Sequence, residues 1–156
     1  MDLGIIRKAT TNDLNGIIKI EKKCFNDYLA YTPRQLEYLL LKANSNCLIE
    51  TFQDSIRGFI LVLYKRNSQI AGIETINVDP VHQGKGIGKK LLNAAEIEMI
   101  SNNIRKIRLE VSTGNQRAIK LYEKLGFRKI GIINNYYRYN HHDSYDAFRF
   151  VKILTT

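Results

Sequence analysis

Two spacings of apolar residues divide this chain into short segments. Helical spacing follows Thr11 or Asn12, Thr32 and Asn115, which are residue types that cap helices, and it also begins at Ile87. Strand-like runs, rich in β-branched and aromatic residues, lie between the helical segments. These runs span residues 3–8, 47–52, 56–65, 69–78, 104–112, 127–133 and 145–154. The predicted order of elements is therefore β-α-α-β-β-β-α-β-α-β-β.

The ends and connections of these segments predict how they pair. Thr32, Pro33 and Gln35 form a helix-capping pattern, and Gly126 stands where glycine commonly ends a helix. Short polar turns join the three middle strands, which predicts an antiparallel meander. The third of these strands is followed by a helix and another strand, which predicts one parallel crossover. We expect a single α/β domain over residues 1–156, with a mostly antiparallel mixed sheet flanked by about four helices.

Composition and charge narrow the function without naming it. The chain of 156 residues is 44% hydrophobic and has no apolar run long enough for a membrane span, so we expect a cytoplasmic protein. Its net charge is +9, but Lys and Arg are spread along it without a nucleic-acid motif, so nucleic acid is not the expected substrate. Cys24 and Cys47 form no disulfide framework, and His141-His142-Asp143 lacks a spaced third ligand, so no metal is expected.

A glycine-rich loop separates a β-branched strand from an apolar helix. Gln83-Gly84-Lys85-Gly86-Ile87-Gly88 follows Val78-Asp79-Pro80, where proline ends the strand. Glycines let the backbone turn tightly and present several N–H groups to one point, and a helix that starts there adds its own free amides. Lys85, Lys89 and Lys90 add positive charge. The loop is therefore predicted to bind phosphate, although its spacing matches neither the P-loop nor the dinucleotide fingerprint.

This loop resembles the pyrophosphate loop of the GNAT N-acetyltransferases, which follows the pattern Q/R-x-x-G-x-G/A after a strand. The order of elements is also similar to that of the family over nearly the full length. The resemblance implies the GNAT fold, acetyl-CoA as co-substrate, and an extended cofactor arm that pairs with the preceding strand as an added strand would. The residues that it implies for the cofactor are Ile76, Asn77, Val78, Gln83, Gly84, Lys85, Gly86, Ile87 and Gly88.

A second stretch strengthens the resemblance. Residues 109–127 read Leu-Glu-Val-Ser-Thr-Gly-Asn-Gln-Arg-Ala-Ile-Lys-Leu-Tyr-Glu-Lys-Leu-Gly-Phe, which is similar to the RimI-type protein N-terminal acetyltransferases. The resemblance implies Glu110 as the general base, Tyr122 as the general acid and Asn115 as a cofactor contact. From spacing alone, Glu110 is as well explained as an exposed or Arg-paired strand carboxylate, and Tyr122 as a core aromatic residue.

Tyrosines and one further carboxylate are candidates for the acceptor side. Tyr136 and Tyr137 resemble a tyrosine pair that this subfamily has near the acceptor peptide, and Tyr28 lies after the first helix. Many GNAT enzymes carry a base at the position of Gly72. Here Glu74, two residues later, is the reserve candidate, and alternation along the strand predicts that it shares a face with the side chains at 76 and 78.

These features lead to the hypothesis of direct acetyl transfer from acetyl-CoA to an amine. The first expectation for the acceptor is the N-terminal α-amino group of a protein or peptide, such as a ribosomal protein. Two alternatives stay open: acetylation of a small amine such as a polyamine, an amino acid or an aminoglycoside, and a non-catalytic module that binds acetyl-CoA. Monomer and homodimer are equally compatible with the sequence.

Overall fold

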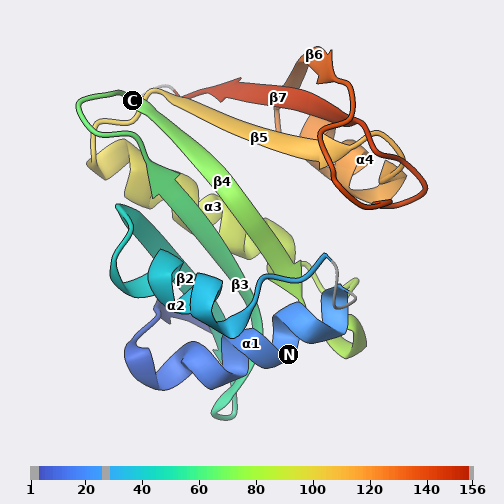
Figure 1. The fold of residues 1–156 in the computed structure, drawn as a ribbon. Helices are drawn as coiled ribbons and strands as arrows, with labels where there is room; N and C mark the ends of the chain where they lie inside the picture. The colour runs from blue at the N-terminus through green and yellow to red at the C-terminus, as the bar shows by residue number, and fades with distance from the viewer. Residues whose placement is uncertain (1–3, 26–28, 155–156) are drawn as a thin grey trace.

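All strands of the computed structural model join one mixed sheet of seven strands, in the order β1-β2-β3-β4-β5-β7-β6 (Figure 1). The structure describes residues 4–25 and 29–154. The strands are β1 (Ile5–Lys8), β2 (Ser45–Phe52), β3 (Ser55–Tyr64), β4 (Ile70–Val78), β5 (Lys106–Ser112), β6 (Arg128–Ile133) and β7 (Ala147–Ile153). The helices are α1 (Leu14–Cys24), α2 (Pro33–Leu41), α3 (Ile87–Ser101) and α4 (Gln116–Lys124), with 3₁₀ turns η1 (Thr11–Asp13) and η2 (Pro80–His82).

The predicted fold class is confirmed by the strand pairing. Neighbouring strands are antiparallel throughout the sheet, except that β4 and β5, joined through α3, are parallel. The last two strands pair with each other, and β7 also inserts between β5 and β6. The final strand thereby extends the sheet beyond the parallel crossover.

Helices cover both faces of the sheet and enclose two apolar clusters. The larger cluster lies under α3 and α4, and its fully buried members include Leu91, Leu92 and Ile107. The smaller one lies between the sheet and helices α1 and α2, around Ile17, Leu36 and Phe59. Figure 1 shows α1 and α2 in front of the β2–β4 half of the sheet and α3 behind it.

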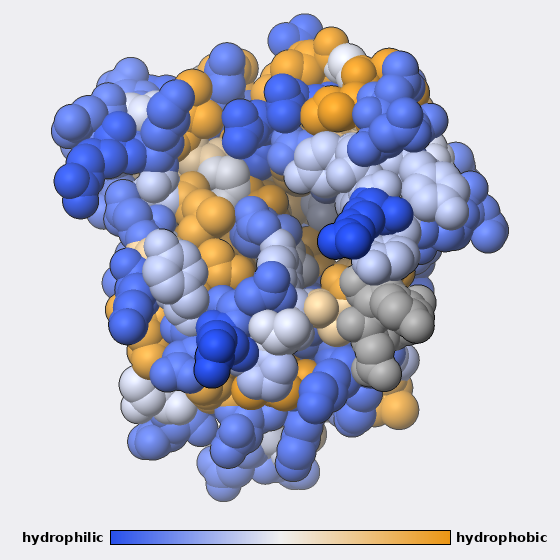
Figure 2. Space-filling model, in the orientation of Figure 1, coloured by the Kyte–Doolittle hydropathy of each residue, from blue (hydrophilic) through white to orange (hydrophobic). Residues whose placement is uncertain are grey.

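Strands β4 and β5 pair over only three residues each and then separate. The paired residues are Ile70 to Gly72 on β4 and Lys106 to Arg108 on β5. Beyond them the two strands diverge, and Figure 1 shows the V-shaped opening that results. In the same orientation, Figure 2 shows that the surface is hollowed at this opening, with apolar atoms inside the hollow and hydrophilic side chains around it. The fold therefore leaves one edge of β4 without a neighbouring strand at the centre of the sheet.

Local capping signals were reliable guides to where helices begin and end. Thr32 and Gln35 form the predicted capping box at the start of α2. Gly126 ends α4 at φ +95°, a conformation that glycine adopts without a steric cost. The predicted cap of the first helix, Thr11 or Asn12, was wrong. Thr10 instead caps the 3₁₀ turn that leads into α1, and its N–H donates to Asp13 Oδ2. The buried residues of α4 are Ile119 and Tyr122.

A buried ion pair joins β2 and β3. Arg57 Nε donates to Glu50 Oε1 at 2.8 Å, its Nη2 bonds to the other carboxylate oxygen, and both side chains are almost fully buried. Glu50→Gln should lower the free energy of unfolding by about 3–5 kcal/mol, since it removes one charge of a buried ion pair. Urea unfolding measures the loss. Glu50→Leu combined with Arg57→Met should recover most of it, and a loss below about 1 kcal/mol in Glu50→Gln would contradict this role.

Candidate active site

The open edge of β4 offers backbone groups to an extended ligand. Asp79 N–H donates to Arg57 O at 2.7 Å, so alternate residues of β4 direct their backbone groups to β3. Ile76 and Val78 have the opposite parity, and their N–H and C=O groups therefore face the opening. The Val78 carbonyl accepts from Cys24 Sγ at 3.3 Å and from Gln83 Nε2 at 3.1 Å. This arrangement matches the expected position of a cofactor arm that pairs as an added strand.

The glycine loop at the end of β4 holds a row of free amides. Gly84 and Gly86 have φ of +84° and +81°, and Gly86 stands immediately before α3. Among the described residues, no group accepts from the backbone N–H of any of residues 84–89. A Cβ added to Gly84 or Gly86 would meet no atom within 4 Å, so the space in front of the loop is open. Free amides, an open concave backbone and a helix start together suit a pyrophosphate.

Two cationic side chains stand at the loop, Arg117 from outside the predicted motif and Lys85 from within it. Arg117 Nη1 on α4 reaches across the opening and donates to Gln83 Oε1 at 3.0 Å. Lys85 Nζ lies 3.2 Å from Nδ1 of His82. Both cations stand beside the free amides and favour an anionic ligand. No pattern in the sequence marks Arg117, because only the fold brings α4 next to the loop.

Asn115 has a structural role at the start of α4. Its Oδ1 accepts from the N–H of Ala118 at 3.2 Å, which is the bond of a helix N-cap. Its side-chain NH₂ donates to no group in the part of the chain that the structure describes. The predicted cofactor contact therefore has its NH₂ group available, and the cap fixes the direction in which that group points.

Glu110 lies mid-strand on β5, on the face turned away from α3 and α4. Arg149 Nε donates to Glu110 Oε2 at 3.2 Å, Arg108 Nε lies 3.7 Å from the same oxygen, and the Tyr136 hydroxyl is 3.5 Å from Oε1. Burial, and then the charge of Glu110, raise the pKa of Tyr136. The structure therefore brings Glu110 and Tyr136 together, as expected for a shared site. It also shows the Arg pairing that spacing alone had left as an alternative.

Tyr122 is buried on α4 and keeps its proton. Its ring packs against Phe127 and Phe150, with centroids 5.6 and 6.5 Å away. Burial raises the pKa of Tyr122 to about 12, and its hydroxyl bonds to no group within the described ranges. A neutral phenol that is free to donate is suited to protonating a leaving group.

Glu74 faces Glu110 from the other side of the opening, but not on the predicted side of its strand. The register of β3 against β4 shifts at this residue, so that Ile73 and Ile76 both pack into the larger cluster and Glu74 turns toward α1 and α2. There the Tyr31 hydroxyl donates to Glu74 Oε1. Burial, followed by this bond, raises the pKa of Tyr31. The expectation that Glu74 shares the face of positions 76 and 78 was wrong, because alternation ends at a bulge.

A groove of about 340 Å³ adjoins Glu74. Its other lining residues come from the start of α2 and the segment before it: Tyr31, Thr32, Arg34, Gln35, Tyr38 and Leu39. Glu74 has no cationic partner within residues 4–25 and 29–154. The groove is therefore a candidate for the acceptor, with one carboxylate at its inner end. Tyr28, a predicted acceptor residue, lies outside the described residues, whereas Tyr137 packs edge-on against Tyr136 at 4.9 Å.

A buried carboxylate that sequence reasoning missed joins α1 to β4. Glu21 accepts from Asn77 Nδ2 at 2.7 Å and from Tyr31 N–H at 2.9 Å, and burial raises the pKa of this carboxyl. Asn77 therefore directs its side chain to α1 rather than to the opening. Glu21 holds together the strand that borders the opening and the segment that carries Tyr31. In the sequence, the signal that could have revealed this contact is an acidic residue at a core position of the first helix.

Comparison with known proteins decides the family. Residues 14–127 match the acetyltransferase (GNAT) family. The chain belongs to this family. Among its relatives, the N-alpha-acetyltransferase RimI of Mycobacterium tuberculosis is 38% identical over 77 residues, 49% of this chain and 47% of that protein. The [ribosomal protein bS18]-alanine N-acetyltransferase of Haemophilus ducreyi is 37% identical over 87 residues, 56% and 59% of the two chains. This GNAT chain spans about half the length of the curated relatives that it matches.

Solved structures show the same fold. The ribosomal-protein-S18-alanine N-acetyltransferase of Escherichia coli superposes with a TM-score of 0.87 at 24% identity, over 99% of this chain and 96% of that one. Arabidopsis thaliana NAA60, in complex with acetyl-CoA, superposes with a TM-score of 0.82 at 18% identity, over 97% and 99%. At these identities the likeness is one of fold alone, and it confirms the GNAT architecture. In the described part of the chain no helix has the length and apolarity to span a membrane.

The two thiols of this GNAT protein, Cys47 buried and Cys24 half-buried, should react slowly. Burial raises the pKa of Cys24 to about 11 and that of Cys47 to about 12, so both stay protonated at neutral pH. Because the thiolate is the nucleophile, native protein should be alkylated by iodoacetamide at pH 7.5 at least about tenfold more slowly than protein unfolded in urea. Mass spectrometry measures both rates. Rapid native modification at Cys24 would contradict the protonated, tethered thiol.

Proposed function

We propose that this protein acetylates the N-terminal α-amino group of a protein or peptide, with acetyl-CoA as the donor. The observation that carries the proposal is the opening between β4 and β5, which has free amides at its end, Glu110 on β5 and Glu74 on β4. Two relatives named as N-terminal or bS18-alanine acetyltransferases support the choice of acceptor. The proposal treats residues 1–156 as one catalytic domain that works in the cytoplasm.

The loop and the open strand edge are proposed to hold acetyl-CoA. Acetyl-CoA supplies an activated thioester, and it is the donor that GNAT acetyltransferases use. The amides of residues 84–89 bind its pyrophosphate, with Lys85 and Arg117 beside them. The backbone of Ile76 and Val78 pairs with the extended arm, and the free amide of Asn115 contacts it from α4.

Two proton transfers complete the reaction. The acceptor arrives as an ammonium and must lose a proton before its nitrogen can form the new bond to the acetyl carbon. Glu110 takes this proton, directly or through a water molecule. Arg149 and Tyr136 fix the orientation of the carboxylate. When the carbon–sulfur bond breaks, Tyr122 donates its phenolic proton to the departing sulfur.

The acceptor is proposed to enter past the groove beside Glu74. Tyr136 and Tyr137 form the wall on the β7 side, and Tyr31 forms the wall on the α2 side. A carboxylate without a cationic partner attracts an ammonium group, which suits an N-terminus. The same feature would also suit a small cationic amine, so this second class of acceptor belongs in the test.

Thiol release from acetyl-CoA, measured with a panel of amines, tests the proposal. The panel contains short peptides with varied N-termini, the same peptides with blocked N-termini, polyamines and free amino acids. We expect turnover with free peptides and none with the blocked ones. Turnover confined to small amines would assign the second acceptor class, and tight acetyl-CoA binding without any turnover would make the protein a binding module.

Removing the proposed base should slow the reaction without weakening cofactor binding. Glu110→Gln keeps the shape of the side chain but cannot accept the proton, so kcat should fall about 10²–10⁴-fold. The Kd of acetyl-CoA, measured by calorimetry, should stay within about twofold of the wild-type value. Asp54→Asn, which neutralises an exposed carboxylate in the β2–β3 turn, is the matched control and should keep full activity. An unchanged kcat in Glu110→Gln would rule out the assignment.

The pH dependence should identify the proposed acid. Because burial raises the pKa of Tyr122 to about 12, the phenol stays protonated through the alkaline range in which a free tyrosine would ionise. Wild-type kcat should therefore show no decline centred near pH 10. Tyr122→Phe should lower kcat about 10²–10⁴-fold at every pH from 7 to 10. A decline near pH 10 that disappears in Tyr122→Phe would show that Tyr122 ionises there, against this prediction.

A further inference from the structure

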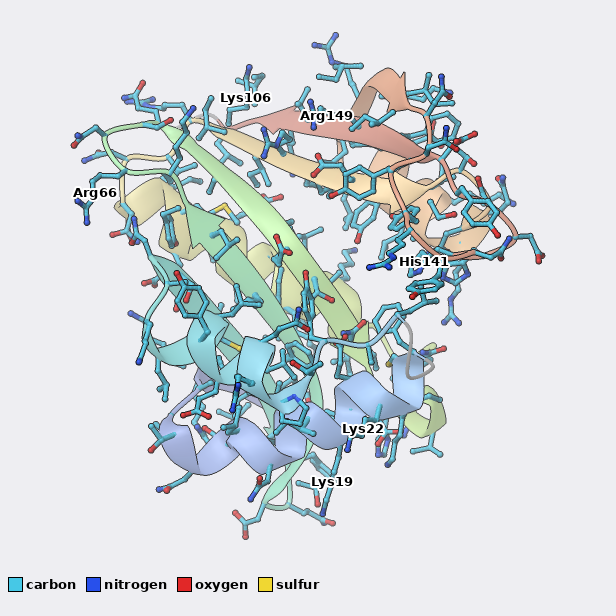
Figure 3. All side chains as sticks on the ribbon, in the orientation of Figure 1. Lys19, Lys22, Arg66, Lys106, His141 and Arg149 are labelled. Carbon is cyan, nitrogen blue, oxygen red and sulfur yellow. The ribbon has the colours of Figure 1, made fainter. Side chains whose placement is uncertain are left out.

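A histidine outside the family motif connects the two sides of the opening. The ring of His141, in the β6–β7 connection, stacks on Tyr137 at 4.5 Å and on Phe25, at the end of α1, at 5.5 Å. The interplanar angles of 17° and 23° show that both contacts are face to face. Figure 3 shows His141 projecting from this connection toward the end of α1. The ring therefore bridges two segments more than 110 residues apart in the sequence.

The backbone around His141 is fixed to the end of β5. Ser112 Oγ donates to the carbonyl of His141 at 2.5 Å, and His141 N–H donates to the carbonyl of Ser144 at 2.8 Å. A Cβ on Gly114 would lie 1.7 Å from the carbonyl oxygen of His142, so only glycine permits this close approach. The backbone of His141 is thus bonded to Ser112, which lies two residues along β5 from Glu110.

From His141 the contacts continue to the proposed base. Tyr137 meets Tyr136 edge-on, with ring centroids 4.9 Å apart and an interplanar angle of 84°. The Tyr136 hydroxyl in turn lies 3.5 Å from Glu110 Oε1. Phe25, His141, Tyr137 and Tyr136 therefore form a continuous series of ring contacts that ends at Glu110.

The imidazole makes these contacts as a neutral ring. Burial, and then the nearby His142, lower the pKa of His141 to about 4. Its Nδ1 is buried and has no hydrogen-bond partner among the described residues. Because the ring is neutral and this nitrogen makes no hydrogen bond, neither explains the position of the ring. The imidazole therefore acts through stacking on the neighbouring rings.

We propose that His141 is a positioning residue for the acceptor: its ring, stacked between Phe25 and Tyr137, holds the Tyr136–Tyr137 pair as a wall of the acceptor path beside Glu110. The inference rests on the proposed function for the existence of an acceptor, and on ring geometry for everything else. It assigns no chemical step to the histidine. The ring should matter for acceptor binding and not for acetyl-CoA binding, because the amides of residues 84–89 lie on other elements.

The test compares His141→Ala, which removes the ring, with His141→Phe, which keeps a stacking ring and removes the buried nitrogen. Asp143→Asn in the same connection is the matched control, since asparagine also tolerates its positive φ of 59°. The measurements are kcat and KM for whichever amine of the panel the wild type acetylates, the Kd of that amine in the presence of CoA, the Kd of acetyl-CoA, and Tm. Spectra of ¹³C-labelled tyrosine rings report on Tyr136 and Tyr137 without any acceptor.

We expect His141→Ala to raise the KM and Kd of the acceptor about tenfold through the loss of two ring contacts, with the acetyl-CoA Kd and kcat within about twofold of wild type. The Tyr136 and Tyr137 resonances should move in this variant. His141→Phe and Asp143→Asn should match the wild type in kcat, in KM and in both Kd values.

Three results would overturn the proposal. Unchanged acceptor affinity and tyrosine spectra in His141→Ala would show that the ring positions nothing. A His141→Phe variant as impaired as His141→Ala would assign the effect to the ring nitrogen. A parallel loss of acetyl-CoA affinity and Tm would make the histidine a general folding residue. Failure of the proposed function has a different signature, since the wild type itself would then turn over no amine while the tyrosine spectra still report on the ring contacts.

Discussion

The separation of β4 from β5 after three paired residues is the constraint on which the rest of this structure depends. A sheet that continued its parallel pairing would satisfy the backbone of Ile76 and Val78 and leave no room for a ligand. Because the strands diverge, polar backbone groups are exposed at the centre of the fold, where an extended ligand can pair with them. The glycine loop, α4 and the groove beside Glu74 all border this one opening.

Polar contacts and ring stacking fix both sides of the opening to helix α1 and its neighbours. On one side Glu21 binds Asn77 and the backbone of Tyr31, while Lys23 pairs with Asp79 at 2.9 Å. On the other, the β6–β7 connection is bonded to the end of β5 and stacked on the end of α1 through His141. Glu110 and Glu74, the two carboxylates at the opening, have different partners. Glu110 pairs with guanidinium groups, and Glu74 accepts a hydrogen bond from a phenol. This difference suits one carboxylate for a fixed chemical role and the other for attracting an ammonium group.

Much of the fold and part of the site followed from local sequence signals. The capping box at Thr32, the glycine that ends α4 and the alternation of Ile107, Leu109 and Val111 depend on neighbours within a few residues, so they are readable from the chain. The glycine loop is local in the same sense, since positive φ and free amides are properties of the loop itself. The predicted face of Glu74 was wrong because a bulge interrupts the alternation of β4. A bulge depends on the register of the partner strand, which the local sequence does not show.

The sequence by itself determined the order of elements, the glycine-rich turn between β4 and α3 and the resemblance that marked Glu110 and Tyr122, because each is encoded in contiguous residues. Only the tertiary structure decided which distant groups meet: Arg117 with Gln83, Arg149 with Glu110, Tyr31 with Glu74 and Phe25 with His141. Each of these contacts joins residues at least 34 positions apart, and none is specified by spacing along the chain. They arise because burial of two apolar clusters on opposite faces of one sheet brings these segments together, and that burial is a property of the whole chain.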